Sequence, residues 1–306
     1  MRKILITTIT ILFFLTACQV IPKSIQTPVP REFLSISDVE STTSAFEALA
    51  RAEGEAWHSP DNRAFRAVFS EDAIFTDRTF GDHAVGIEAI EALSASMALG
   101  LAPSWKAQGT DRYIGLEGGL EVVNIWDLEL GGYKFSEADP QVELDWLQTR
   151  GNSITAMTVL YSLDSMKKSY GAPRERLDQA NSLLSSYQSA WSSGDPRAVA
   201  GLYASEAVRE DSIFGEKQQG GEAIGSFAKL FFAWYPGAQW SLSLGFGEGR
   251  GDAPMTGGLY ALRVNDLAGQ PCDVQAAVLL QVSEDQILHE EVFYEPQSLV
   301  KCGWAR

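Results

Sequence analysis

The sequence predicts an α+β fold arranged as two tandem domains, and three observations support this prediction. Ala56–Ile90 aligns with Ala190–Ile224 at a constant shift of 134 without gaps, and 14 of the 35 positions are identical. The alignment resumes at a shift of 133, where Tyr161 meets Tyr294. In the second copy, segments with helical spacing come first and alternating segments follow, which indicates about three helices packed on an antiparallel sheet.

The first 18 residues have the pattern of a cleaved signal peptide. Arg2 and Lys3 precede an apolar run, Ile4–Leu15, that is too short to be a membrane span. The run leads into Leu15-Thr16-Ala17-Cys18, which resembles a bacterial lipobox. This resemblance implies that Cys18 becomes an acylated first residue that anchors the protein to a bacterial membrane, whereas the alternative is an ordinary secretory signal. Gln19 resembles the outer-membrane sorting pattern, which implies an envelope protein facing the periplasm.

The remaining boundaries follow from composition and from the repeat. Residues 19–40 contain Pro22, Pro28 and Pro30 and show no helical periodicity, so we expect a flexible tether. The first domain is expected at 41–166, a linker at 167–175, the second domain at 176–297 and a C-terminal tail at 298–306. Each copy, at about 130 residues, is long enough to bury its own core.

Charge and cysteine content restrict the partners and the compartment. Without Arg2 and Lys3 the chain has 22 basic and 40 acidic residues, a formal charge of −18. Nucleic acid is therefore excluded as an expected partner, because it requires a basic surface. Besides Cys18 only Cys272 and Cys302 are present. In an oxidising envelope they could form a disulfide that joins the C-terminal tail to an inner strand, or they could remain separate buried thiols.

The helices of the second copy are predicted from spacing and capping. The helical spacing of Leu183, Leu184, Tyr187, Ala190 and Trp191 predicts a first amphipathic helix. Asp195 and Pro196 predict the start of a second helix, with an inner stripe of Val199, Leu202 and Tyr203. Gly220-Gly221 open a third helix, which carries Ile224, Phe227, Phe231 and Trp234 and ends before Pro236.

Five strands are predicted in the same copy. They are Ala207–Asp211, Trp240–Leu244, Leu259–Val264, Val274–Val282 and Ile287–Tyr294. The segment GFGEGRG, residues 245–251, lacks the spacing of a phosphate-binding loop and is predicted to connect a hairpin.

Two motifs in each copy carry a family resemblance. The first is W-x-x-x-D, at Trp57–Asp61 and Trp191–Asp195; the second is a strand that ends in Asp-x-x-Phe-Gly, at Asp77 and Asp211. With the order of the elements, these motifs resemble the nuclear-transport-factor-2-like superfamily, which includes SnoaL-like polyketide cyclases and ketosteroid isomerase. The resemblance implies a cystatin-like cone, in which a curved sheet and a helix enclose a mostly apolar pocket. It fixes the fold better than the activity, because this fold has many functions.

Ketosteroid isomerase uses an aspartate base, a tyrosine and a protonated aspartic acid. The resemblance places the base at Asp77 and Asp211. It places the tyrosine at Tyr187 in the second copy, where the first copy has Glu53. It places the second acid at Asp145 in the first copy, where the second copy has Val278. Neither copy contains the complete set.

The neighbours of each aspartate along its strand predict different environments. Arg209 lies two residues before Asp211 and should share its face, which favours a buried ion pair. Phe75 occupies the corresponding position before Asp77 and should raise the pKa of that aspartate. If Asp145 and Glu53 face the same cavity, at least one of the acids should stay protonated, which suits acid–base chemistry. The alternative is an aspartate that only binds local backbone N–H groups at the end of its strand.

Other candidate ligand-binding residues are aromatic. Besides Glu53, Phe75 and Arg209, the pocket residues proposed are Phe80, Trp105 and Trp126 in the first copy and Phe214 and Trp240 in the second. The three histidines, His58, His83 and His289, show no metal-ligand spacing, so neither a metal nor a cofactor is expected.

Three functions remain compatible with the sequence. The first is a lipid-anchored envelope protein that binds a small apolar molecule. The second is an isomerase, cyclase or hydratase with Asp77 as base and Asp145 as acid. The third is a non-catalytic scaffold, in which the two copies pack sheet to sheet and bind another envelope protein. The incomplete catalytic sets favour the first and the third.

Overall fold

The computed structural model describes residues 48–57, 63–101, 103–116, 120–130, 141–169, 174–215, 217–248, 254–266, 268–283 and 285–304. The signal peptide, Cys18 and the tether lie outside these residues, as do His58 and Asp61. Among the described helices none is both long enough and apolar enough to cross a bilayer.

The first half begins with the helical segment 48–57. The elements that follow are α2 (Arg63–Val68), β1 (Phe69–Asp77), β2 (Asp82–Val85), α3 (Ile87–Leu101), β3 (Pro103–Ile114), β4 (Leu120–Leu130), β5 (Gln141–Arg150), β6 (Ser153–Ser162) and α4 (Leu163–Ser169). Residues 163–169 are thus helical across the predicted boundary between the first domain and the linker.

The second half repeats this order. Its elements are α5 (Arg174–Ser193), α6 (Pro196–Ala200), β7 (Tyr203–Asp211), β8 (Gln218–Gln219), α7 (Gly221–Trp234), β9 (Gln239–Gly247), β10 (Met255–Asn265), β11 (Pro271–Ser283), β12 (Gln286–Tyr294) and α8 (Pro296–Lys301). The predicted C-terminal tail therefore contains most of a short helix.

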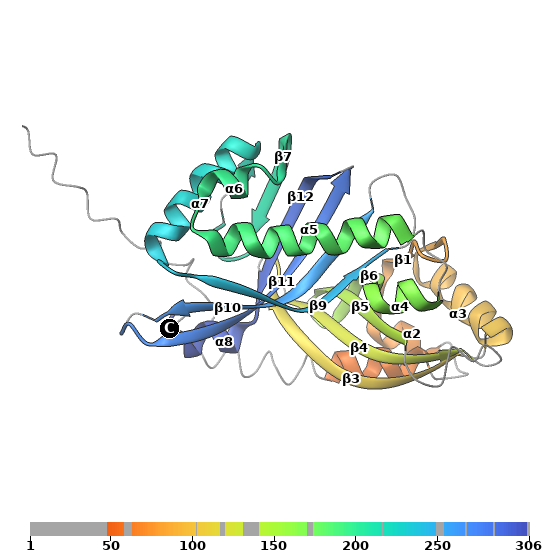
Figure 1. Cartoon of the computed structure of the whole chain (residues 1–306). Coiled ribbons are helices and arrows are strands. Elements are labelled where there is room, and N and C mark those ends of the chain that lie inside the picture. The colour runs from red at the N-terminus through yellow and green to blue at the C-terminus, as the bar shows by residue number, and fades with distance from the viewer. Residues whose placement is uncertain are drawn as a thin grey trace, which may run out of the picture.

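The structure is α+β and contains one large, mostly antiparallel sheet. Twelve strands form it, in the order β3-β4-β5-β6-β9-β10-β11-β12-β7-β8, while β1 pairs with β6 and β2 with β1. The two halves join where Tyr161 and Ser162 of β6 pair with Gly247 and Phe246 of β9. In Figure 1, α6 and α7 gather near β7 and β12, whereas α3 lies at the opposite end of the molecule.

The sheet is mainly antiparallel, as expected, but one strand pair in each half is parallel. β1 runs parallel to β6, and β7 runs parallel to β12. In each half the first strand therefore lies beside the last strand and runs in the same direction. The pairing places the aspartate that ends β1 or β7 beside the last strand of its own half.

Several predicted element ends also need correction. Asp195 caps α6 as predicted, because its side chain accepts a hydrogen bond from the Arg197 N–H at 2.9 Å. However, α6 ends at Ala200, so Leu202 and Tyr203 are not part of its inner stripe. Tyr203 instead begins β7 and pairs with Ile287 of β12, and this pairing takes the backbone out of the helix.

The glycine-rich segment is not wholly a loop. Gly245 and Gly247 belong to β9 and pair with β10. A Cβ atom at Gly245 would lie only 3.1 Å from Leu184 and 3.3 Å from Leu163. The glycine therefore allows α4 and α5 to approach the sheet closely.

Two hydrophobic clusters stabilise the fold. The larger one lies between the helices and the sheet and contains residues of both halves. The second contains five residues from each half: Tyr113, Val123, Leu144, Trp146, Leu160, Phe246, Leu259, Ala277, Leu279 and Phe293. The Trp146 ring contacts Phe246 and Phe293, with centroids 6.4 and 5.1 Å apart. The two halves thus pack against each other through one face of their strands.

Candidate functional site

Asp77 ends β1 inside the first half and is only 2 % exposed. Its Oδ1 accepts hydrogen bonds from the Thr79 and Phe80 N–H groups at 2.9 and 3.3 Å. Its Oδ2 accepts one from the Tyr161 hydroxyl at 2.8 Å. Burial raises the pKa of Asp77 to about 6, and these hydrogen bonds limit the rise. The residue thus combines the backbone-binding role with a near-neutral pKa.

Asp145, on β5, lines a cavity together with Asp77 and is 2 % exposed. Burial raises its pKa to about 7; hydrogen bonding with Trp126 and Glu143 limits the rise, and the charge of Asp77 adds to it. The two acids proposed from the resemblance are therefore brought together in the first half. Because burial raises both pKa values and that of Asp145 more, Asp145 keeps its proton to a higher pH than Asp77 does.

Glu53, in the segment 48–57, is completely buried beside this pair. Its Oε2 accepts a hydrogen bond of 2.8 Å from Nδ2 of Asn124, which lies opposite Asp145 in the register of β4 and β5. Burial raises the pKa of Glu53 well above its usual value, and Asp145 acts in the same direction. Glu53 therefore lies near Asp145, which favours its protonation, but it is not among the residues that line the cavity with Asp77 and Asp145.

The cavity lined by Asp77 and Asp145 is small. It has a volume of about 20 Å³, which is room for roughly one water molecule. Its lining is Gly54, Trp57, Phe75, Asp77, Met97, Trp126, Glu143, Asp145, Met157, Val159 and Tyr161. Oδ1 of Asp145 is buried without a hydrogen-bond partner among the described residues. A bound water or ligand donor would meet this atom.

The predicted aromatic residues of the first half differ in position. Phe75 and Trp126 line the cavity, with 1 % and 9 % exposure. Phe80 is 42 % exposed and does not line the cavity; its ring packs edge-to-face with that of Tyr161, with centroids 5.8 Å apart. Trp105 belongs to β3, but its side chain lies outside the described part of the chain.

The interior of the second half contains a charged network. Arg209 is 2 % exposed and forms the predicted ion pair with Asp211, with Nη2 and Oδ2 2.7 Å apart. Its Nε lies 3.1 Å from Oε2 of Glu290. The guanidinium also lies over the Phe227 ring, 4.5 Å from its centroid, which is favourable for a desolvated cation.

Tyr187, the counterpart of Glu53, joins this network. Its hydroxyl donates to Oε1 of Glu290 at 2.6 Å, and the Tyr203 hydroxyl donates to Oε2 at 2.5 Å. Burial raises the pKa of Glu290, while Arg209 acts in the opposite direction. Tyr187 therefore binds Glu290 rather than a developing oxyanion on a substrate.

Aromatic rings fill the space around the network. Trp240 is 3 % exposed and packs edge-on against Tyr187, with centroids 5.9 Å apart. Phe214 is partly buried and stacks with Trp234 at 6.0 Å. The predicted pocket residues of the second half are thus part of its packed interior.

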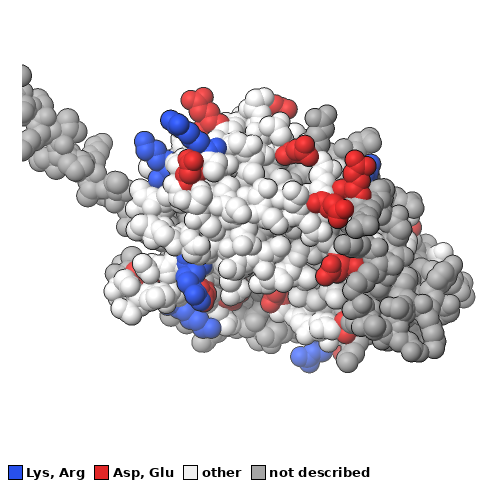
Figure 2. Space-filling view, viewed as in Figure 1, with Lys and Arg blue, Asp and Glu red and all other residues white. Residues whose placement is uncertain are grey.

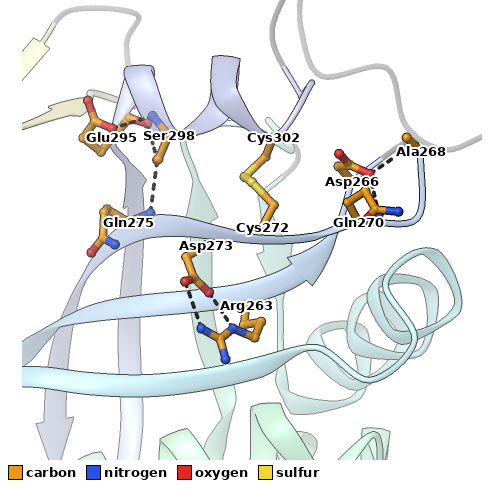
Figure 3. The surroundings of a disulfide bond; sticks show 10 residues. All are labelled: Arg263, Asp266, Ala268, Gln270, Cys272, Asp273, Gln275, Glu295, Ser298 and Cys302. Atoms are coloured by element: carbon orange, nitrogen blue, oxygen red, sulfur yellow. Dashed lines mark hydrogen bonds and ion pairs between the residues drawn. A yellow bond between two sulfur atoms is a disulfide. The ribbon is translucent and has the colours of Figure 1, made fainter.

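Cys272 and Cys302 form a disulfide, with Cα atoms 5.6 Å apart (Figure 3). The bond joins β11 to the end of α8, whose start is capped by Glu295. Near it, the Ser298 hydroxyl accepts a hydrogen bond from the Gln275 N–H at 3.1 Å. Trp304, just beyond α8, stacks on Tyr235 at 4.5 Å. The disulfide therefore holds the C-terminal segment against the second half.

Charged side chains on the face seen in Figure 2 are scattered. Basic and acidic groups lie interspersed among other residues, without a continuous basic area on the described part of that face. This distribution agrees with the acidic composition.

Sequence reasoning missed Glu290, Tyr161 and Tyr203. Glu290 alternates with His289 and Glu291 on β12, so the period of two could have placed it inward. Tyr161 recurs as Tyr294 in the repeat, and each hydroxyl donates to the aspartate that ends the neighbouring strand, at 2.8 and 3.1 Å.

Comparisons with known proteins give structural similarity only. No protein-family model and no curated protein matches the chain. A hypothetical protein with a ketosteroid isomerase-like fold from Catenulispora acidiphila, solved with trimethylamine, is 19 % identical, with a TM-score of 0.35, over 40 % of this chain and 93 % of its own. A putative polyketide cyclase from Sinorhizobium meliloti is 12 % identical, with a TM-score of 0.30, over 37 % and 93 %. An LEH-like epoxide hydrolase from M. tuberculosis is 15 % identical, with a TM-score of 0.33, over 41 % and 89 %.

Proposed function

We propose that this chain is a lipid-anchored protein of the bacterial envelope that binds a small, largely apolar molecule in the cavity of its first half. In this proposal the chain forms two tandem SnoaL-like domains. Acylated Cys18 anchors the protein to the outer membrane, and residues 19–40 form a flexible tether.

The difference between the two interiors supports the proposal. The first half has Phe75 and Met157 where the second has Arg209 and Glu290, at the repeat shifts of 134 and 133. The second interior is closed by an ion pair and its hydrogen bonds. The first retains a cavity with apolar walls and acids of raised pKa. A pocket with apolar walls and a few polar groups is typical of small-molecule sites.

A ligand larger than water requires the cavity to enlarge. Met97, on α3, lines the cavity and is only partly buried. Its unbranched thioether side chain can change rotamer at low cost. We therefore infer that movement of Met97 opens the pocket, and that Asp145 Oδ1 receives a hydrogen-bond donor of the ligand.

The test is native mass spectrometry of the chain exported without its acyl anchor, compared with a denatured sample. An additional mass that disappears on denaturation is expected, and it should be lost in Asp145→Leu, which removes the accepting oxygen, but retained in Asp195→Asn, an exposed control on the second half. A bare mass, unchanged by a panel of small apolar compounds, would contradict ligand binding and favour the scaffold.

A second candidate is acid–base catalysis on such a molecule, with Asp77 as base and Asp145 as acid. The near-neutral pKa values of these two buried groups favour it. Loss of turnover of an enone substrate in Asp77→Asn, with ligand binding retained, would support this activity. Equal turnover in the variant and the wild type would exclude Asp77 as the base.

A further inference from the structure

The strand face of the second half that packs against the first half also carries, beside that contact, three polar side chains that the network inside does not use. Asp211 on β7 and Glu290 on β12 are buried in the interior. Glu210 precedes Asp211, and His289 and Glu291 flank Glu290, so these three side chains lie on the opposite face of the strands. Glu210 lies directly beside Glu291 in the register of this parallel pair. The strand geometry therefore brings Glu210 beside His289 and Glu291, which lie 79 and 81 residues further along the chain.

We infer that Glu210, His289 and Glu291 bind a divalent transition-metal ion such as Zn²⁺. Their ligand atoms all lie within 4.8 Å of one another. His289 Nε2 is 2.8 Å from Glu210 Oε2 and 4.0 Å from Glu291 Oε1. Ligands held about 2.0–2.2 Å from one zinc ion lie roughly 3–3.5 Å apart. Small side-chain rotations would therefore bring all three onto one ion.

The donor set fits this class of metal. One imidazole nitrogen and two carboxylate oxygens suit Zn²⁺ and its neighbours in the first transition series better than Ca²⁺ or Mg²⁺, which prefer oxygen alone. The three side chains are 26 to 32 % exposed, so an ion can enter from solvent and retain water ligands. A cavity of about 130 Å³, lined in part by His289 and Glu291, gives those waters room.

The repeat shows that the fold does not require this group. The corresponding positions of the first half are Thr76, Ala156 and Thr158, and Thr76 lies beside Thr158 in the same register. Neither a threonine nor an alanine offers a comparable ligand. The three donors are thus specific to the second half.

One cation already competes for the group. Nζ of Lys217 lies 3.3 Å from Glu210 Oε1, but its side chain is 60 % exposed. An exposed ion pair of this kind contributes little to stability. Lys217 can therefore move away when a divalent ion binds.

The experiment is titration of the purified, chelator-treated full chain with Zn²⁺ by calorimetry and with Co²⁺ by visible absorption. One ion per chain is expected, with Co²⁺ bands that show nitrogen and oxygen ligands. His289→Ala and, separately, Glu291→Gln should weaken binding by about tenfold or more. His83→Ala, on the exposed side of the first half, is the matched control and should bind as the wild type does.

Lys217→Ala removes the competing charge and should tighten binding severalfold. Glu210→Gln should weaken binding as much as Glu291→Gln does; unchanged binding in Glu210→Gln would mean that Glu210 is not a ligand, which overturns the three-residue site. No ion bound to the wild type would overturn the inference, as would equal binding in His289→Ala and Glu291→Gln. Circular dichroism of the metal-free variants separates loss of a ligand from loss of the fold.

Discussion

The Tyr161 hydroxyl donates a hydrogen bond of 2.8 Å to Oδ2 of Asp77, and their repeat partners Tyr294 and Asp211 make the same bond at 3.1 Å. In each half, two backbone N–H groups bind the other carboxylate oxygen. Both halves keep this arrangement although their interiors differ. The arrangement therefore stabilises the end of the strand in both halves. The residues around each aspartate then determine its pKa and whether it can take part in acid–base chemistry.

Tyr161→Phe should raise the pKa of Asp77 further above about 6. The hydroxyl binds the charged carboxylate, so its loss removes an interaction that favours the ionised form. The variant should also lose about 1 kcal/mol of stability, as is typical for one buried hydrogen bond. Carboxyl-carbon NMR across pH measures the first effect, and urea unfolding measures the second.

Tyr294→Phe is the control for this experiment. It should reduce stability by a similar amount and leave the titration of Asp77 unchanged. A Tyr161→Phe variant in which Asp77 titrates as in the wild type would show that the hydroxyl does not influence the carboxylate.

The buried acids of the first half should make stability depend on pH in one direction. Burial raises the pKa of Asp77 to about 6 and of Asp145 to about 7, compared with about 3.9 in an unfolded chain. Between these values the folded protein retains protons that the unfolded chain releases. The contribution of these two groups is therefore complete below about pH 4 and is lost as the pH rises through 6 and 7.

Asp145→Asn should reduce this loss, because an amide stays neutral at every pH. The measurement is the free energy of unfolding in urea at pH 5 and at pH 8 for the wild type and the variant. The difference between the two pH values should shrink in Asp145→Asn and not in Asp195→Asn. The same difference in all three proteins would show that ionisation of Asp145 has no cost in the fold.

The sequence predicted local features well where one segment contains all the information. Asp195 caps α6, α7 begins at Gly221 and ends at Trp234, and Arg209 pairs with Asp211. Each of these follows from helical periodicity, capping residues or the alternation of one strand. The α+β class followed similarly from the order of the segments.

Features that depend on strand register could not be predicted from spacing. The bond between Tyr161 and Asp77 spans 84 residues and exists because β1 lies parallel to β6. Glu290 reaches Arg209 for the same reason in the other half. The volume of the first cavity depends on how Met97 and Trp126 pack, which the residue pattern alone does not fix.

The ion pair of the second half should be strongly coupled. Arg209→Phe leaves Glu290 and Asp211 buried without their cation and should cost about 3–5 kcal/mol. Arg209→Phe combined with Glu290→Met recreates the residues of the first half, Phe75 and Met157, and removes one of the uncompensated charges. The double variant should be more stable than the sum of the single effects predicts, by about 1–3 kcal/mol. Urea unfolding of the four proteins in the cycle measures this coupling; additive effects would contradict it.

The disulfide should stabilise the second half and hold its C-terminal segment in place. Cys272 and Cys302 close a loop with a sequence separation of 30, and loss of such a crosslink typically costs about 2–4 kcal/mol. Cys302→Ser, like reduction, should lower stability by this amount and release Trp304, which stacks on Tyr235. Trp304→Phe provides the comparison for the fluorescence change, because it removes the reporter and keeps the crosslink. If reduced and oxidised proteins unfold at the same urea concentration, contacts of α8 with β11, such as that between Ser298 and Gln275, hold the segment without the covalent bond.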